Sequence, residues 1–191
     1  MKNKFLFTLM IAIVFTGLVS PKNSLAASKS LYVENYSQEG SKWCWVTAGQ
    51  IVIEYLSGTT YSQCTLYKAG KGVSACSNEA GGFYADMARV LDYGNVHVGY
   101  VTTGLPPMYT ITEEIDGNSP MLARIGWKSG GSTGHMLILR GYNTDGSYVR
   151  FVYPKESDSY TDRTSDYRTM TWSSLKDNSD WELTHTRYQL N

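Results

Sequence analysis

The sequence predicts one α+β domain, with helices in its first half and antiparallel strands in its second. Apolar residues recur with helical spacing over Cys44–Ser57. Met121–Trp127 and His135–Tyr142 are short, nearly continuous apolar runs, which are typical of strands. Asn143–Gly146 follows with the residues of a hairpin turn. Helices and antiparallel strands segregated in this way are typical of the α+β class.

The first 26 residues are predicted to be a secretory signal peptide and not part of the fold. Lys2 and Lys4 precede an apolar run from Phe5 to Val19, and Ser24-Leu25-Ala26 has the small residues of a cleavage site. A retained membrane anchor is the alternative, but no charged stop-transfer flank follows the apolar run. We therefore expect a secreted protein with a single domain over residues 27–191.

The other elements are predicted from the same two periodicities and from turn residues. Ser41 is expected to cap the helix of residues 44–57, and Gly58 to end it. Residues 59–82 carry four glycines and are expected to be loop. The remaining predictions are an extended segment over Ser28–Tyr36, a helix over Phe83–Tyr93, a strand over Val96–Val101, a short helix from Thr112, strands over Ser147–Tyr153 and Tyr167–Trp172, a helical turn over Ser173–Lys176 and a last strand over Trp181–Thr186.

The charge balance argues against nucleic acid and anionic membranes as partners. The chain has 17 Lys plus Arg and 17 Asp plus Glu, and loss of Lys2, Lys4 and Lys22 would leave 14 basic residues and a net charge of −3. Binding to such polyanions ordinarily requires a basic patch. No metal or cofactor is expected, because the three histidines lack metal-ligand spacing and no phosphate-binding glycine motif is present. We expect a monomer.

The cysteine count indicates one free thiol. Three cysteines in an exported protein leave one over, and Cys64 and Cys76 are close enough in sequence to close a small loop. Cys44 would then be free, although its pairing with one of the others is an alternative. Cys44 begins the predicted helix, where the backbone N–H groups and the helix dipole stabilise a thiolate. Gln38, six residues upstream, can supply an amide donor, which favours a reactive thiol.

His135 is the candidate base for Cys44. It lies where a Gly/Ser-rich loop enters an apolar strand, and an imidazole there can take the thiol proton and return it to a leaving group. Alone, such a histidine is more often an ordinary strand residue. The catalytic interpretation depends on its combination with Cys44 and Gln38. His97 and His185 lie in simpler strand contexts and are interpreted as structural or surface residues.

Four features occur in one order along the chain. They are Gln38, then, after five intervening residues, Cys44 between two tryptophans, the segment Ser119–Trp127, and the block Gly134–Tyr142. In this order the chain resembles the bacterial papain-like cysteine peptidases, especially secreted staphopain-like enzymes and type III effector proteases of plant pathogens. The resemblance covers nearly all of the chain after residue 26. It implies a papain-like fold, with the cysteine helix packed on a C-terminal antiparallel β half.

The resemblance also implies roles for single residues. Cys44 would be the nucleophile and His135 the general base and then acid, while Gln38 and the backbone N–H of Cys44 would form the oxyanion hole. The implied activity is that of an endopeptidase that forms an acyl-enzyme on protein or peptide substrates, with a proteinaceous inhibitor as a further partner. Two alternatives are a cell-wall amidase or peptidoglycan endopeptidase, and a catalytically impaired papain-like binding protein.

One position departs from the family pattern. The family usually has Asp or Asn before a proline at the end of the next strand, where it fixes the imidazole tautomer. This chain has Tyr153 before Pro154. A phenol can accept a hydrogen bond but is neutral, so it would stabilise an imidazolium less. Asp158, Asn143 and Asp145 are alternatives for this role.

Overall fold

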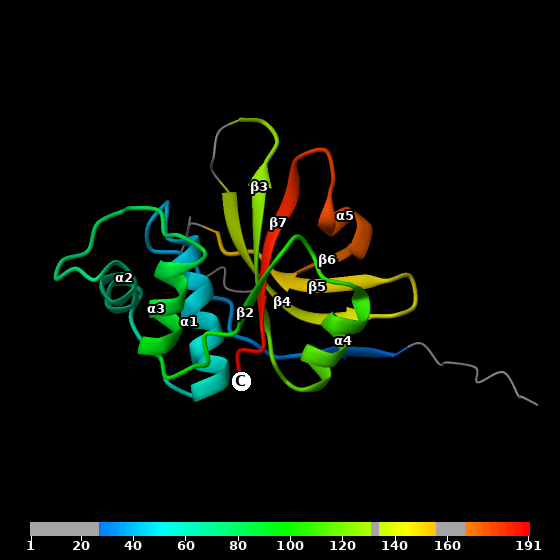
Figure 1. Ribbon diagram of the computed structural model, residues 1–191, viewed down its shortest axis with the longest axis horizontal. Coiled ribbons are helices and arrows are strands. Elements are labelled where there is room, and N and C mark those ends of the chain that lie inside the picture. The colour runs from blue at the N-terminus through cyan, green and yellow to red at the C-terminus, as the bar shows by residue number, and fades with distance from the viewer. Residues whose placement is uncertain (1–26, 131–133, 156–166) are drawn as a thin grey trace, which may run out of the picture.

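The computed structural model describes residues 27–130, 134–155 and 167–191. Within these residues the α+β class is confirmed, with helices α1 (Cys44–Ser57), α2 (Gln63–Lys71) and α3 (Ala85–Tyr93) on one side and an antiparallel sheet on the other (Figure 1). The predicted signal peptide and Asp158 lie outside the described residues. None of the helices in the described part of the chain has the length and apolarity of a membrane span.

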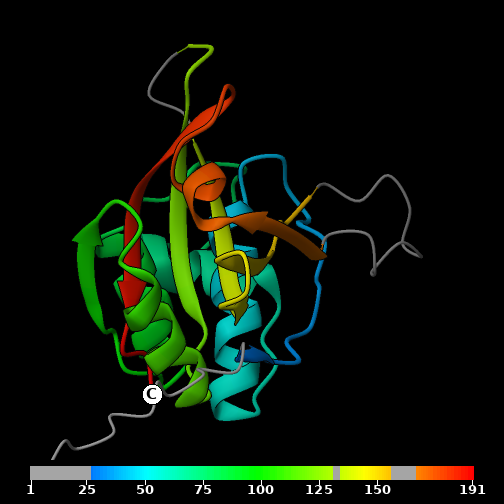
Figure 2. The same cartoon turned by 90° about the vertical axis from the view of Figure 1, so that its right-hand side faces the viewer.

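The sheet is antiparallel throughout and has the strand order β2-β7-β3-β4-β5-β6, with β1 paired to β4. Figure 2 views the strands from the side opposite α1–α3, which lie behind them. The predicted strand over Val96–Val101 begins later, because the chain turns at Gly99, where φ is +64°. The strands are β1 (Ser28–Ser30), β2 (Tyr100–Thr103), β3 (Met121–Trp127), β4 (Gly134–Asn143), β5 (Tyr148–Val152), β6 (Tyr167–Thr171) and β7 (Trp181–Tyr188).

One helix, α2 (Gln63–Lys71), was not predicted from the sequence, because its segment was interpreted as a glycine-rich loop. The loop expected over residues 59–82 is wrong over α2, which Ser62 caps by accepting a hydrogen bond from the Thr65 N–H. Gly70 does not break this helix; it is required there because a Cβ would lie 2.6 Å from the Trp45 ring. The helices are α1 (Cys44–Ser57), α2 (Gln63–Lys71), α3 (Ala85–Tyr93), α4 (Met108–Asp116) and α5 (Trp172–Lys176).

Helix α1 carries the predicted nucleophile on a buried element. It packs against β4, and its residues from Trp45 to Ile53 are buried. Gly58 ends it in the left-handed region, as predicted. The predicted cap is wrong: Trp43 is the N-cap residue and its side chain makes no capping hydrogen bond, while the Ser41 hydroxyl accepts a hydrogen bond from Asn78. Within the described residues, the first N–H groups of α1 therefore lack a cap from the N-cap side chain and face the site.

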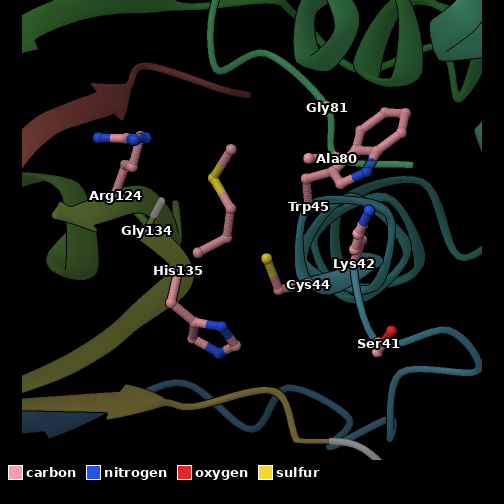
Figure 3. A pocket seen from close by; sticks show the side chains of 10 residues that line it. Ser41, Lys42, Cys44, Trp45, Ala80, Gly81, Arg124, Gly134 and His135 are labelled. Atoms are coloured by element: carbon pink, nitrogen blue, oxygen red, sulfur yellow. The ribbon is translucent and has the colours of Figure 1, made fainter. Parts of the chain in front are cut away.

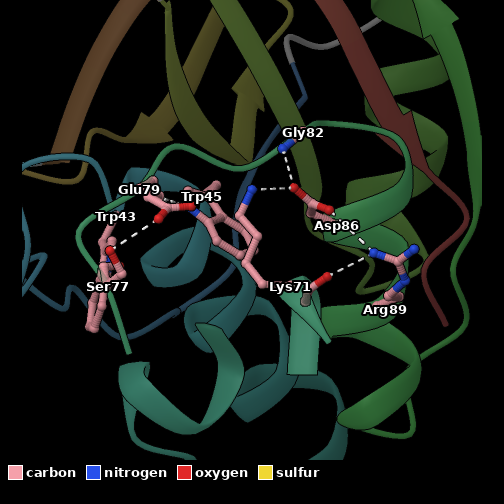
Figure 4. Close-up of polar contacts among 9 residues, drawn as sticks. Trp43, Trp45, Lys71, Ser77, Glu79, Gly82, Asp86 and Arg89 are labelled. Carbon is pink, nitrogen blue, oxygen red and sulfur yellow. Dashed lines mark hydrogen bonds and ion pairs between the residues drawn. The ribbon is translucent and has the colours of Figure 1, made fainter. Parts of the chain in front are cut away.

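A covalent bond and several hydrogen bonds fix the loop that follows α2. The predicted Cys64–Cys76 disulfide is confirmed, and Cys44 is the free cysteine. The Trp43 indole donates to the Ser77 carbonyl at 2.9 Å, and the Trp45 indole donates to the Glu79 carbonyl at 3.2 Å; Figure 4 labels these residues. The loop is thus bonded directly to the start of α1.

Asp86 of α3 fixes the end of the same loop by hydrogen bonds. Its carboxylate accepts hydrogen bonds from the Gly82 N–H and from Lys71, both at 2.8 Å (Figure 4). Burial raises the pKa of Asp86, but the bond from Gly82 and the charge of Lys71 outweigh it, so the pKa lies below its usual value. The stabilisation is therefore present above the ordinary carboxyl pKa and is lost as the pH falls through the lower folded-state pKa.

We expect Asp86→Asn to lower the free energy of unfolding by about 1–3 kcal/mol at neutral pH, because charge-assisted hydrogen bonds are lost. The loss should shrink as the pH falls below the ordinary carboxyl range, where the wild type also loses the charge. Urea unfolding at a series of pH values measures both effects. Asp92→Asn, on the exposed face of the same helix, is the control. Equal losses at all pH values would contradict the electrostatic explanation.

Candidate active site

Cys44 and His135 both line a pocket of about 420 Å³ between α1 and β4. Cys44 is the first residue of α1, and His135 is the second residue of β4, opposite Ile125 of β3. Figure 3 shows the two side chains projecting from their elements into the same space. The lining residues are Ser41, Lys42, Cys44, Trp45, Ala80, Gly81, Arg124, Gly134, His135 and Met136.

The Cys44 thiol experiences opposing effects. Burial raises its pKa, whereas hydrogen bonds from the backbone N–H groups of Met136 and Trp45 and the charge of Arg124 lower it. The net result is a pKa above the ordinary thiol value, so burial outweighs the stabilisation expected from the helix start. A group that takes the proton is therefore needed, and His135 is the histidine that lines the pocket.

Gln38 lies in the turn that leads into α1, and it is buried. Its amide Nε2 donates to the carbonyl oxygens of Gly40 and Ser41, both at 3.2 Å, while its backbone N–H donates to the Lys155 carbonyl at 2.8 Å. The last bond joins this turn to the chain after β5. Both amide hydrogens are thus engaged within the turn, and Gln38 does not line the pocket. The Gln38 amide can donate to an oxyanion only after one of its two 3.2 Å hydrogen bonds breaks.

Gln63 holds the Gln38 turn from the side of α2. It is a buried residue whose Oε1 accepts from the Glu39 N–H at 2.8 Å and whose Nε2 donates to the Ser37 carbonyl at 2.7 Å. It is therefore hydrogen-bonded to the residues on both sides of Gln38. The sequence interpretation missed it because residues 59–82 were expected to be loop.

Tyr153 stacks on the imidazole of His135. The ring centroids are 4.3 Å apart and the planes differ by 24°. The Arg168 guanidinium lies over the Tyr153 ring, 3.9 Å from its centroid. The order β4-β5-β6 places His135 and Arg168 on opposite sides of Tyr153. The three side chains therefore form a stack along the sheet, in which the tyrosine limits rotation of the imidazole.

Asn143 and Asp145, which were also considered for the orienting role, lie far from His135. Asn143 ends the ten-residue strand β4, whereas His135 is near its start. The Asn143 side chain accepts a hydrogen bond from the Asp145 N–H within the hairpin. Asn143 and Asp145 are therefore wrong as candidates. Neither His97 nor His185 lines the pocket: His97 bonds the Gln189 carbonyl at 2.8 Å, and His185 packs on Phe83 and Tyr84.

Arg124 is a further pocket residue that was not singled out from the sequence. It lies on β3, where it is the only charged residue of Met121–Trp127. A charge inside an apolar strand was the available signal. Among the described residues, no group of three or more His, Cys, Asp or Glu side chains is arranged to hold a metal ion.

The fold and this site define a cysteine protease with a papain-like fold. The sequence model of the Peptidase_C39-like family matches residues 30–188, and the chain belongs to that family. Among solved structures, the chain resembles Xylellain, a cysteine protease from Xylella fastidiosa, with a TM-score of 0.57 and 11% identity over 86% of each chain. No curated protein sequence matches the chain significantly.

Proposed function

We propose that this cysteine protease is a secreted endopeptidase that cleaves protein or peptide substrates through an acyl-enzyme at Cys44. The observation that carries the proposal is the placement of Cys44 and His135 in one open pocket, with Cys44 at the uncapped start of α1. Export is supported by the signal-peptide pattern of residues 1–26 and by the Cys64–Cys76 disulfide, because disulfides persist in oxidising compartments.

The proposed reaction begins with proton transfer from the Cys44 thiol to His135. The thiolate then attacks the peptide carbonyl, and the backbone N–H of Cys44 stabilises the oxyanion, joined by the Gln38 amide after it releases one of its hydrogen bonds within the turn. His135 returns the proton to the departing amine, which leaves a thioester on Cys44. Water then attacks the thioester, His135 again takes and returns a proton, and the carboxylic acid product leaves.

The direct test is cleavage of denatured casein together with labelling by an epoxide inhibitor, located by peptide mass. We expect cleavage and one label on Cys44, and neither with Cys44→Ala. Clearing of purified cell walls with intact casein would favour an amidase or peptidoglycan endopeptidase instead. Failure to act on either substrate, with slow labelling, would indicate a papain-like binding protein.

Tyr153 is proposed to position His135 by stacking. Tyr153→Phe keeps the aromatic face and should retain most of the activity, whereas Tyr153→Ala should lower kcat about tenfold, because an aromatic contact of about 0.5–1.5 kcal/mol is lost. KM should change little. Arg168→Gln should have a smaller effect in the same direction. Equal loss of kcat in the Phe and Ala variants would show that the hydroxyl, and not the ring, positions the histidine.

A further inference from the structure

The pocket beside Cys44 carries positive charge on two walls. Arg124 of β3 lies on the sheet side and Lys42 lies beside α1 (Figure 3). None of the described residues that line the pocket is acidic. His185, opposite Arg124 on β7, adds no charge at neutral pH, because burial and then the charge of Arg124 lower its pKa.

Arg124 is held in position by its neighbours. The register of β3 and β7 shifts between Arg124 and Ile125, so that Thr184 is bulged out of the ladder. Such irregularities re-aim side chains. Thr184 Oγ1 accepts a hydrogen bond from Arg124 Nη1 at 2.9 Å and donates one to the Arg124 carbonyl at 3.0 Å. The guanidinium also passes close to Gly134, where a Cβ would lie 3.1 Å from Arg124 Cζ.

This guanidinium shares the pocket with the nucleophile. Arg124 pairs with Met136 on β4, both residues line the pocket with Cys44, and the charge of Arg124 lowers the pKa of the Cys44 thiol. An extended peptide advances by about 3.3 Å per residue, so its side chains within two residues of the scissile bond can reach the pocket. Guanidinium groups stay charged throughout the accessible pH range and bind carboxylates in a fixed geometry.

We propose that Arg124 makes this pocket selective for an acidic side chain, so that preferred substrates carry Glu or Asp within two residues of the scissile bond. The proposal rests on the proposed peptidase function and adds the substrate class. An ion pair formed in a partly buried pocket favours Glu over the isosteric, neutral Gln. Lys42, on the exposed wall, adds to the positive potential but is more strongly screened by solvent.

The test uses fluorogenic peptides that differ only by Glu or Gln at each of the two positions on either side of the scissile bond. In the wild type we expect kcat/KM to favour Glu about tenfold or more at one position, and this ratio to fall with added salt. In Arg124→Met the ratio should approach one while the Gln peptide is still cleaved. Arg124→Glu should prefer Lys at that position.

The matched control is Arg89→Met on α3, whose side chain is 57% exposed and outside the pocket. It should keep the wild-type ratio. Cleavage by the wild type with a Glu/Gln ratio near one at all four positions would overturn the inference and leave the peptidase function intact. An unchanged ratio in Arg124→Met would also overturn it. If no peptide is cleaved and casein also stays intact, the proposed function falls and the inference falls with it.

Discussion

A His135→Ala variant is expected to lose between about 10² and 10⁴ in kcat/KM, because general acid–base catalysis contributes about that much. The burial of Cys44, which raises its pKa, makes the loss severe. Without an imidazole to accept the proton, the thiol stays protonated at neutral pH. His97→Ala, at an exposed histidine, is the control and should keep full activity.

The same variant has a readout that needs no substrate, namely the pH dependence of Cys44 alkylation by iodoacetamide. Burial alone raises the pKa of the Cys44 thiol. If the thiol proton passes to His135, the resulting thiolate–imidazolium pair outweighs this burial, and we then expect the wild type to react rapidly well below neutral pH. In His135→Ala the reaction should rise only above the ordinary thiol range. A wild-type profile that already rises there, unchanged by the substitution, would contradict a Cys–His pair and the peptidase mechanism with it.

Gly134→Ala is expected to give the second largest effect. A Cβ at this position would lie 2.1 Å from the Ile125 carbonyl oxygen and 3.1 Å from the Arg124 guanidinium. Because the first contact is with backbone, β3 and β4 must move apart next to His135. We expect a loss of about 1–3 kcal/mol in the free energy of unfolding. A displacement near 1 Å at the catalytic histidine should lower kcat/KM about 100-fold.

The matched control for this change is Gly126→Ala. Gly126 lies directly opposite Gly134 on β3, but its Cβ would meet a Thr184 methyl group at 3.1 Å and no backbone atom. A small adjustment of that side chain relieves the contact, so activity should stay within a few-fold of wild type. Similar losses in both variants would show that added bulk anywhere in the β3–β4 pair is harmful.

Elements with a clear periodicity were predictable from the sequence. The helix Cys44–Ser57 and the strand Met121–Trp127 have the predicted bounds, because their apolar residues face a core on one or both sides. The helix over residues 63–71 was not predictable from the sequence, because glycine content usually signals a loop. Gly70 is present for a different reason, the close approach of Trp45, which depends on tertiary packing and leaves no local pattern.

The candidate site was predictable in part. Cys44 and His135 were identified by residue type and context, and the structure brings them to one pocket. The stacking of Tyr153 on His135 depends on which strands are neighbours, which a linear sequence does not state. Arg124 lines the pocket beside the bulge at Thr184, and that bulge depends on the pairing of β3 with β7.

The pairing of β1 with β4 decides where the N-terminal part of the chain leaves the domain. Ser28 lies opposite Asn143, eight residues along β4 from His135 and therefore about 27 Å away at the usual rise of a strand. Any segment attached before Ser28 would have to fold back over that distance to cover the pocket. An affinity tag placed there should leave substrate access unobstructed, and a bulky fusion at the same point should be tolerated by the enzyme.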